Sequence, residues 1–177
     1  MEQESFRYPI GNCQIPELIT PETLQNAIDD IRTLPQRVED MLGSLGESKW
    51  DMPYRQAGWT VRQVVHHLAD SHMNALMRLK LALTEKNPTI KPYLEAAWAA
   101  LPDYQMGPQA SLVLLQGIHS HWTTLLESMN QNQWKRTFFH PENRQTTSLM
   151  EHTLLYQWHG NHHLAHLKLL QNQKPIQ

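Results

Sequence analysis

The stretch Tyr156-Gln157-Trp158-His159-Gly160-Asn161-His162-His163-Leu164-Ala165-His166 carries four histidines within eight positions. His159 and His163 are four residues apart, and the same spacing separates His162 from His166. Side chains four residues apart lie on one face of an α-helix, one turn from each other. Two imidazoles in this arrangement form half of a typical site for a divalent metal. The spacing predicts such a site on this helix and leaves both pairs open as its ligands.

A second histidine cluster, His66-His67 with His72, lies far earlier in the chain. A mononuclear site needs at least one more ligand than a helical pair supplies, and helical bundles build sites from side chains on facing helices. We therefore expect the fold to bring the two clusters together. The residue after His159 is Gly160, where zinc peptidases of the two-histidine helix type carry a glutamate as general base. The sequence excludes that class of peptidase.

Hydrophobic residues recur every three to four positions in four long segments, which is the pattern of amphipathic helices. The predicted helices are residues 20–45, 60–83, 108–130 and 148–170. Three of them open with recognisable start signals, namely Thr20-Pro21, Thr60 with Gln63, and Ser148 with Glu151. Pro35 lies inside the first segment, where the missing backbone donor should kink the helix.

Four such helices predict an all-α fold, a four-helix bundle that forms a single domain over residues 1–177. Residues 1–19 show no helical period and predict an extended N-terminal arm that packs over the bundle. Residues 87–108 hold four prolines and predict a long crossover between the second and third helices. The aromatic stretch 134–140 precedes a turn, so a small β-hairpin with residues 145–147 is plausible before the fourth helix.

The composition narrows the classes of partner. The formal net charge is -2 and neither sign forms a long run, which argues against nucleic acid as the main partner. No segment approaches 18 consecutive apolar residues, so no membrane span is expected. Cys13 is the only cysteine, and the acidic N-terminus does not open a signal peptide. The sequence thus predicts a cytoplasmic protein.

Several motifs resemble those of one family. They are Tyr8-Pro9-Ile10-Gly11, Pro53-Tyr54-Arg55, the block from Gly58-Trp59-Thr60 through His66-His67 to Met73-Asn74, Phe139-His140-Pro141, and the histidine stretch from Trp158 to His166. With these motifs the whole chain resembles the YfiT-type metal-dependent hydrolases of the DinB-like superfamily. One departure is Gly160-Asn161, where relatives carry other small or polar residues. A glycine inside a helix costs about 1 kcal/mol against alanine, so the helix should be locally soft there.

The resemblance implies a four-helix bundle, a homodimer, and one divalent metal per subunit held by three histidines. By position these ligands are His67, His159 and His163. The remaining histidines of the two clusters would then pack, support the ligands or face the substrate, and they are His66, His162 and His166. Asp70 lies one turn from His66 and His67 and could orient an imidazole. His119, His121 and His152 are expected to be ordinary histidines of the core or surface.

Three neutral imidazoles leave a divalent ion at least one open position, which is typical of catalytic sites. The first hypothesis is a hydrolase in which the ion, Zn²⁺ ahead of Ni²⁺, activates water for attack on a small molecule. The second is a thiol S-transferase of the bacillithiol type that uses the same site. Arg55, Arg62 or Arg78 could bind the polar body of its low-molecular-weight thiol.

The third hypothesis is a non-catalytic dimeric module, which predicts a site closed by a fourth protein ligand. His66, His162 or His166 might supply that ligand. Trp98, Trp122 and the aromatic hairpin are candidates for the surface that the two subunits of a dimer would share.

Overall fold

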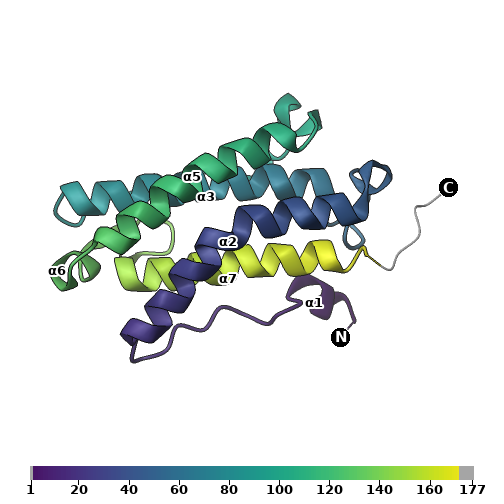
Figure 1. Cartoon of the computed structure of the whole chain (residues 1–177). Helices are drawn as coiled ribbons and strands as arrows, with labels where there is room; N and C mark the ends of the chain where they lie inside the picture. Colours follow the sequence, from purple (N-terminus) through teal and green to yellow (C-terminus); the bar gives the residue numbers. More distant parts are fainter. Residues whose placement is uncertain (1, 172–177) are drawn as a thin grey trace.

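Four long helices dominate the structure, a computed structural model that describes residues 2–171, with side chains from residue 4 onward (Figure 1). They are α2 (Pro21–Leu45), α3 (Val61–Thr84), α5 (Gln109–Ser128) and α7 (Leu149–Lys168). Each lies within two residues of a predicted segment at both ends. The fold is the predicted four-helix bundle.

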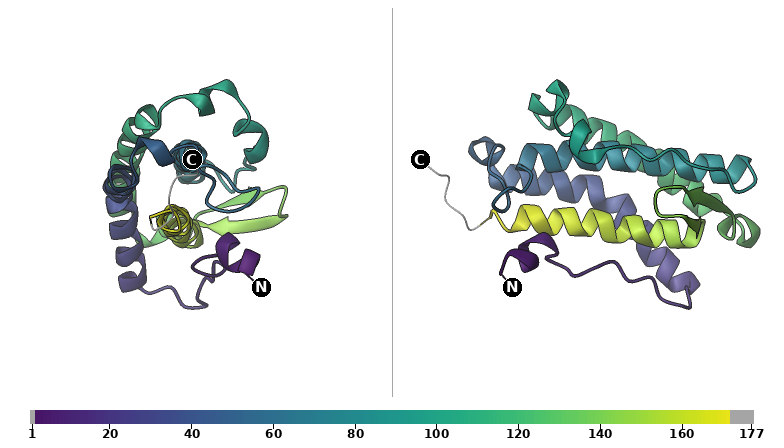
Figure 2. Two further views of the ribbon diagram at one scale, coloured as in Figure 1. Left: turned by 90° about the vertical axis from the view of Figure 1, so that its right-hand side faces the viewer. Right: turned by 180° about the vertical axis from the view of Figure 1, so that it is seen from behind.

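The helices do not follow one another around the bundle. Helix α2 packs against α5 and α7, and α3 packs against the same two helices (Figures 1 and 2). The consecutive helices α2 and α3 are therefore diagonal, and so are α5 and α7. This order makes α3 a direct neighbour of α7, and these two helices carry the two histidine clusters.

The start signals of the helices are satisfied by capping contacts. The Thr60 hydroxyl accepts from the Gln63 amide at 3.2 Å, and the Gln63 side chain accepts from the Thr60 amide at 3.0 Å. Ser148 and Glu151 make the same reciprocal pair at the start of α7. Such a capping box pairs two amides that the first helical turn leaves without partners. Both helices that carry the histidine clusters thus begin where the sequence predicts.

Pro35 is buried inside α2, which continues through it to Leu45. Figure 1 shows the helix changing direction near its middle, as expected where a proline removes a hydrogen bond from the helix. The side of α2 that carries Leu34 packs against α7.

The core consists of two layers of buried side chains, one at each end of the bundle. Trp122 lies in one of them with no exposed surface. It packs edge-on against Tyr156 of α7, at 5.4 Å between ring centroids. The expectation that Trp122 covers a dimer surface is therefore wrong, because this indole forms part of the monomer core.

The N-terminal arm differs from its prediction as a wholly extended segment. It opens with a short helix, α1 (Glu2–Arg7), and then runs along the outside of α7 (Figures 1 and 2). The indole of Trp158 donates to the Gly11 carbonyl at 3.2 Å, which ties the arm to that helix. A helix of six residues has too few turns to show a hydrophobic period in the sequence.

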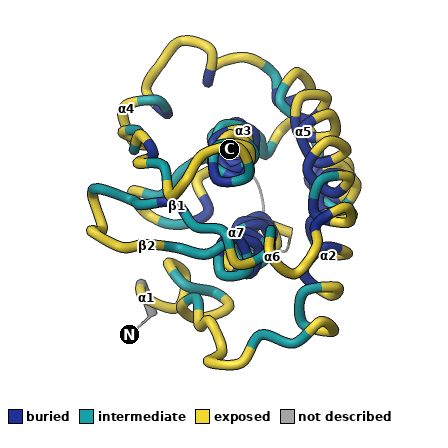
Figure 3. Tube along the Cα trace, turned by 90° about the vertical axis from the view of Figure 1, so that its left-hand side faces the viewer, coloured by how far each residue is buried: buried dark blue, intermediate teal, exposed yellow. Residues whose placement is uncertain are grey.

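The connections hold the remaining elements. They are η1 (Glu47–Lys49), α4 (Glu95–Trp98), η2 (Pro102–Gln105), α6 (Gln131–Trp134), β1 (Thr137–His140) and β2 (Gln145–Ser148). The strands β1 and β2 pair antiparallel, so the predicted hairpin before the last helix is confirmed (Figure 3). The crossover from α3 to α5 runs through α4 and η2 on the outside of the bundle. Within the described residues no helix is long and apolar enough to cross a membrane.

Candidate metal centre

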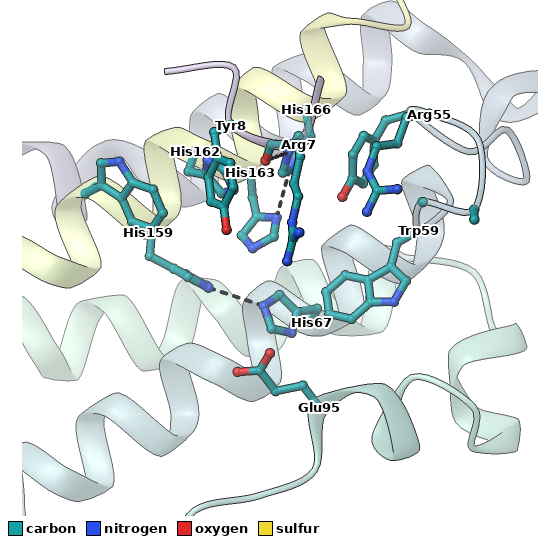
Figure 4. Close-up of a pocket in the computed structure, with 14 residues that line it drawn as sticks. Arg7, Tyr8, Arg55, Trp59, His67, Glu95, His159, His162, His163 and His166 are labelled. Atoms are coloured by element: carbon teal, nitrogen blue, oxygen red, sulfur yellow. Dashed lines mark hydrogen bonds between the residues drawn. The ribbon is translucent and has the colours of Figure 1, made fainter. Parts of the chain in front are cut away.

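Three histidines from two helices converge between α3 and α7. His67 comes from α3, while His159 and His163 lie one turn apart on α7. One ring nitrogen of each lies within 4.8 Å of the others. Figure 4 shows the three rings facing one another at the floor of a pocket. The neighbouring pair His162 and His166 does not take part in this convergence.

All three imidazoles are held in the neutral state. Burial, reinforced by the nearby His162, lowers the pKa of His67 to about 3. Burial and the other imidazoles of the cluster also lower the pKa values of His159 and His163 well below the ordinary histidine value. Neutral imidazole is the form that binds metals. Because each ring is neutral, metal binding near neutral pH requires no net loss of a proton from this site.

The spacing of the nitrogens fits a metal. The Nε2 atoms of His67 and His159 face each other at 3.2 Å. Two nitrogen ligands of tetrahedral zinc, each about 2.0–2.1 Å from the ion, are separated by about 3.3 Å. The Nδ1 atom of His67 is buried and has no hydrogen-bond partner within the described part of the chain. Buried polar atoms without partners are rare, and this one belongs to a side chain whose other nitrogen faces the cluster.

The pocket above the three histidines has a volume of about 300 Å³. It lies between the N-terminal arm, the loop that precedes α3, the start of α4 and α7. Its lining includes Arg7, Tyr8, Tyr54, Arg55, Ala57, Gly58, Trp59, Glu95, Trp158, His162 and His166 beside the three converging histidines. Aromatic rings wall it, and the Trp59 indole lies 4.5 Å from the His67 ring, centroid to centroid. The cluster thus opens into a cavity of a size suited to a small molecule.

The pocket contains three charged residues, which are Arg7, Arg55 and Glu95. Arg7 comes from the N-terminal arm and Arg55 from the loop before α3, and neither forms an ion pair among the residues that the structure describes (Figure 4). Glu95 lies below His67, and burial raises the pKa of its carboxyl group. Of the three, only Arg55 was singled out from the sequence. Arg7 and Glu95 come from short segments without a repeating pattern, so no signal in the sequence pointed to them.

The two other arginines considered for substrate binding lie elsewhere. Arg62 forms an ion pair with Asp51 at 2.8 Å and donates to the carbonyl of Gln105. Arg78 donates to the Tyr156 hydroxyl at 3.3 Å. Neither lines the pocket.

His66 and Asp70 are turned away from the three histidines. The His66 ring contacts the Ser111 hydroxyl at 2.7 Å and the Met106 carbonyl at 3.1 Å. Asp70 accepts a hydrogen bond from the Tyr104 hydroxyl at 2.7 Å. In the described residues Asp70 therefore pairs with a tyrosine of η2, and no hydrogen bond joins it to an imidazole.

His162 and His166 lie on α7 beside His159 and His163. The His162 ring stacks on Trp158 at 4.5 Å and lines the pocket. His166 reaches the Arg7 carbonyl with Nε2 at 3.1 Å and the Nδ1 atom of His163 with its own Nδ1 at 3.4 Å. Both histidines thus line the cavity, and His166 also contacts a ring of the cluster.

His72 of the second histidine cluster and His119 of α5 lie behind the three converging histidines. His72 Nε2 contacts His159 Nδ1 at 3.1 Å, and His72 Nδ1 contacts His119 Nε2 at 2.8 Å. His119 Nδ1 in turn reaches the Ile31 carbonyl of α2. His119 is thus a histidine with both ring nitrogens satisfied, as expected, and its ring is two contacts away from His159.

Comparison with known proteins places this bundle in a family. Residues 30–167 match the family model described as the DinB superfamily. The chain belongs to the DinB superfamily. A Bacillus cereus relative and a Bacillus thuringiensis relative, both named "Putative metal-dependent hydrolase", are 47% identical over 168 residues. Each match covers 95% of this chain and 96% of the relative.

A solved structure supports the same assignment for this DinB-superfamily chain. YfiT from Bacillus subtilis is described as "a probable metal-dependent hydrolase with an unusual four-helix bundle topology". It is 44% identical, with a TM-score of 0.91 over 94% of this chain and 95% of that one. The predicted YfiT-type bundle is therefore confirmed.

Proposed function

We propose that this protein is a metal-dependent hydrolase of small molecules, with His67, His159 and His163 as the ligands of one divalent ion. The observation that carries the proposal is the convergence of three neutral imidazoles on the floor of an open pocket. A bound divalent ion supplies Lewis acidity and makes water a nucleophile near neutral pH. Imidazole ligands suit both Zn²⁺ and Ni²⁺, and Zn²⁺ is the ion that we propose. The names of the relatives at 47% identity support this function.

The other residues of the pocket divide the remaining work. Trp59 and Tyr54 wall the site and limit the access of bulk water. Arg7 and Arg55 place two cations at the pocket, so they favour a substrate that carries a carboxylate or phosphate group. Glu95 is a carboxylate beside His67 with a raised pKa, which suits a group that accepts a proton from water during the reaction.

An open coordination position separates this proposal from the non-catalytic module. Closing the site would need a fourth protein ligand. His66 has both ring nitrogens in contact with Ser111 and Met106. Both nitrogens of His166 are also engaged, one by His163 and one by the Arg7 carbonyl. Two of the three candidates for a fourth ligand are thus committed elsewhere, which supports a catalytic site.

The metal ligands can be tested by elemental analysis. Protein purified without a tag should contain about one equivalent of divalent metal per chain. Alanine substitution of His67, His159 or His163 should each remove it, because two imidazoles bind far more weakly than three. His162→Ala is the matched control on the same helix and should retain the metal. If His162→Ala lost the metal and His163→Ala retained it, the proposed assignment of the ligands on α7 would be wrong.

The reaction can be tested with metal-loaded protein and two substrate panels. One panel holds esters and amides with and without a carboxylate, and hydrolysis of the anionic members should be faster. Arg7→Gln and Arg55→Gln should raise KM for those members, whereas Glu95→Gln should lower kcat. Equal rates for anionic and neutral esters would contradict the assigned role of the arginines.

The thiol S-transferase remains the second candidate because Arg55 lines the pocket, where an anionic thiol could bind. The second panel therefore offers a low-molecular-weight thiol with monochlorobimane. Conjugation of the thiol without hydrolysis of the esters and amides would show that the activity is thiol transfer. Neither activity, with metal still bound, would favour the non-catalytic module.

We also propose that the protein is a cytoplasmic homodimer. Exposed apolar side chains on α3 and α5 support an association of subunits, among them Met77 and Val113. Light scattering should then give twice the chain mass of 20.7 kDa. A single-chain mass at micromolar concentration would contradict the dimer.

A further inference from the structure

We propose that two histidine relays, His119–His72 and His166, set the tautomers of His159 and His163 so that each presents the Nε2 lone pair to the metal. His72, His119 and His166 are positioning residues. Their effect on metal binding rests on the proposed function. The tautomers themselves follow from the contacts of the metal-free chain.

The first relay begins at a backbone carbonyl, which can only accept a hydrogen bond. His119 Nδ1 faces the Ile31 carbonyl and must carry the proton. Burial lowers the pKa of His119 to about 4, so the ring is neutral and its Nε2 is an acceptor. His72 Nδ1, 2.8 Å from this acceptor, is therefore the donor of that bond.

The same reasoning determines which ring nitrogen of His159 carries the proton. With its proton on Nδ1, neutral His72 has an acceptor at Nε2, and His159 Nδ1 lies 3.1 Å away. His159 therefore donates from Nδ1 and has no proton on Nε2. That Nε2 is the atom that faces His67 at 3.2 Å.

The contact between His119 and the Ile31 carbonyl excludes the opposite direction of hydrogen-bond donation along this relay. If His72 Nδ1 instead accepted a hydrogen bond from His119 Nε2, neutral His119 would turn the lone pair of Nδ1 toward the Ile31 oxygen. Two acceptors facing each other in the core would leave both without a partner, at a cost of about 1–3 kcal/mol. His72 and His119 are 0% and 2% exposed, so water cannot repair such a mismatch.

The second relay is shorter and independent of the first. His166 Nε2 lies 3.1 Å from the Arg7 carbonyl and is the donor of that bond. Neutral His166 then has an acceptor at Nδ1, which is 3.4 Å from the Nδ1 atom of His163. His163 donates there and also presents an unprotonated Nε2. Each ligand of α7 is thus oriented by a chain that ends on a main-chain oxygen of a different segment.

The arrangement extends a general feature of metal sites. A histidine ligand usually gives its second N–H directly to a carboxylate, a carbonyl or water, and loss of that partner weakens metal binding about 10- to 100-fold. Here two imidazoles stand between His159 and the Ile31 carbonyl, and one stands between His163 and the Arg7 carbonyl. His119, His72 and His166 are therefore expected to matter for metal affinity although none of them is proposed to touch the metal.

The direct test is ¹⁵N NMR of the imidazoles in metal-free, uniformly labelled protein. The expected spectrum shows the proton on Nδ1 for His72, His119, His159 and His163, and on Nε2 for His166. A proton on Nε2 of His159 or His163 would overturn the relays. Because no metal is present, this result is independent of whether the protein proves to be a hydrolase.

Variants test the consequence for metal binding, measured by competition with a chelator. His119→Phe keeps a ring but removes the acceptor, so the affinity should fall about 10- to 100-fold. His119→Gln restores a carbonyl acceptor for His72 and should recover most of the loss. His152→Phe is the matched control, since His152 is equally buried but contacts the Ala75 carbonyl outside the relays. Equal affinity in His119→Phe and wild type, or equal losses in all three variants, would refute a positioning role.

Discussion

At the scale of single residues, the packing of α2 against α7 explains why residue 160 is a glycine. A Cβ at this position would lie 2.6 Å from Cδ2 and 3.2 Å from Cδ1 of Leu34. Leu34 is buried in the core against α7, so its side chain has little room to move. The glycine therefore lets α2 and α7 approach closely, directly next to His159.

This contact predicts the effect of Gly160→Ala. The substitution should lower the free energy of unfolding by about 1–2 kcal/mol, because overpacking outweighs the gain in helix propensity of about 1 kcal/mol. Urea denaturation measures the change. Gly117→Ala is the control, since that glycine lies in α5 with no atom near a new Cβ, and it should stabilise the protein. A stabilised Gly160→Ala would show that Leu34 moves aside freely.

The grouping of His67 with His159 and His163 could be predicted at this scale, because helical spacing and the family resemblance both carried information. The relays could not be predicted. A contact such as that between His119 and the Ile31 carbonyl depends on where α5 meets α2, and the spacing of residues within one helix does not contain it. The same holds for Arg7 and Glu95, which reach the pocket from segments without periodicity.

At the scale of elements, α7 carries two of the proposed ligands and depends on its first turn. Ser148→Ala removes the hydroxyl that accepts from the Glu151 amide. The expected loss in the free energy of unfolding is about 1 kcal/mol. Chemical denaturation checks it, and Ser148→Thr should restore most of the stability because threonine also caps helices. Unchanged stability in the alanine variant would mean that the hairpin alone holds the start of α7.

The long helices were predictable because each has an apolar stripe, and three of the four also open with a capping signal. The short ones were less so. The six residues of α1 and the four of α6 are too few to display a period, and packing against the bundle holds them in place. The order of the helices around the bundle was also beyond the sequence, since a stripe shows that a face is buried but not which helix covers it.

At the scale of the whole molecule, the proposed metal would link α3 to α7 and stabilise the fold. An ion at 100 times its dissociation constant adds about 2.7 kcal/mol to the free energy of unfolding. For a chain of this size that corresponds to a rise in Tm of about 5–10 °C. Calorimetry with Zn²⁺ and with a chelator measures it. The His67→Ala variant should show no such rise, and an equal rise in that variant would place the ion elsewhere.

Buried histidines also predict a dependence of stability on pH in the metal-free protein. Burial lowers the pKa of His152 to about 3, against about 6.5 in the unfolded chain. The unfolded state therefore binds more protons below pH 6.5, and the free energy of unfolding falls as the pH falls toward 4. The slope is up to about 1.4 kcal/mol per pH unit for each such histidine.

Urea denaturation at pH 7.5, 6 and 5 measures this slope. His152→Phe should make it shallower by removing one of these buried groups. His121→Phe is the control, because His121 is exposed on α5 and should leave the slope unchanged. Equal stability of the wild-type protein at pH 7.5 and 5 would contradict the prediction.

The pocket is built partly from long helices of the bundle and partly from short segments at its edge. Its floor belongs to α3 and α7, whose residues are also the core of the bundle, whereas its rim is made by the arm at Arg7, the loop at Arg55 and the short α4 at Glu95. Substitutions in the floor risk the fold, but the rim can be exchanged while the bundle stays intact. Descendants of such a protein could therefore acquire new substrates by altering three short segments, and a designer could randomise those segments alone.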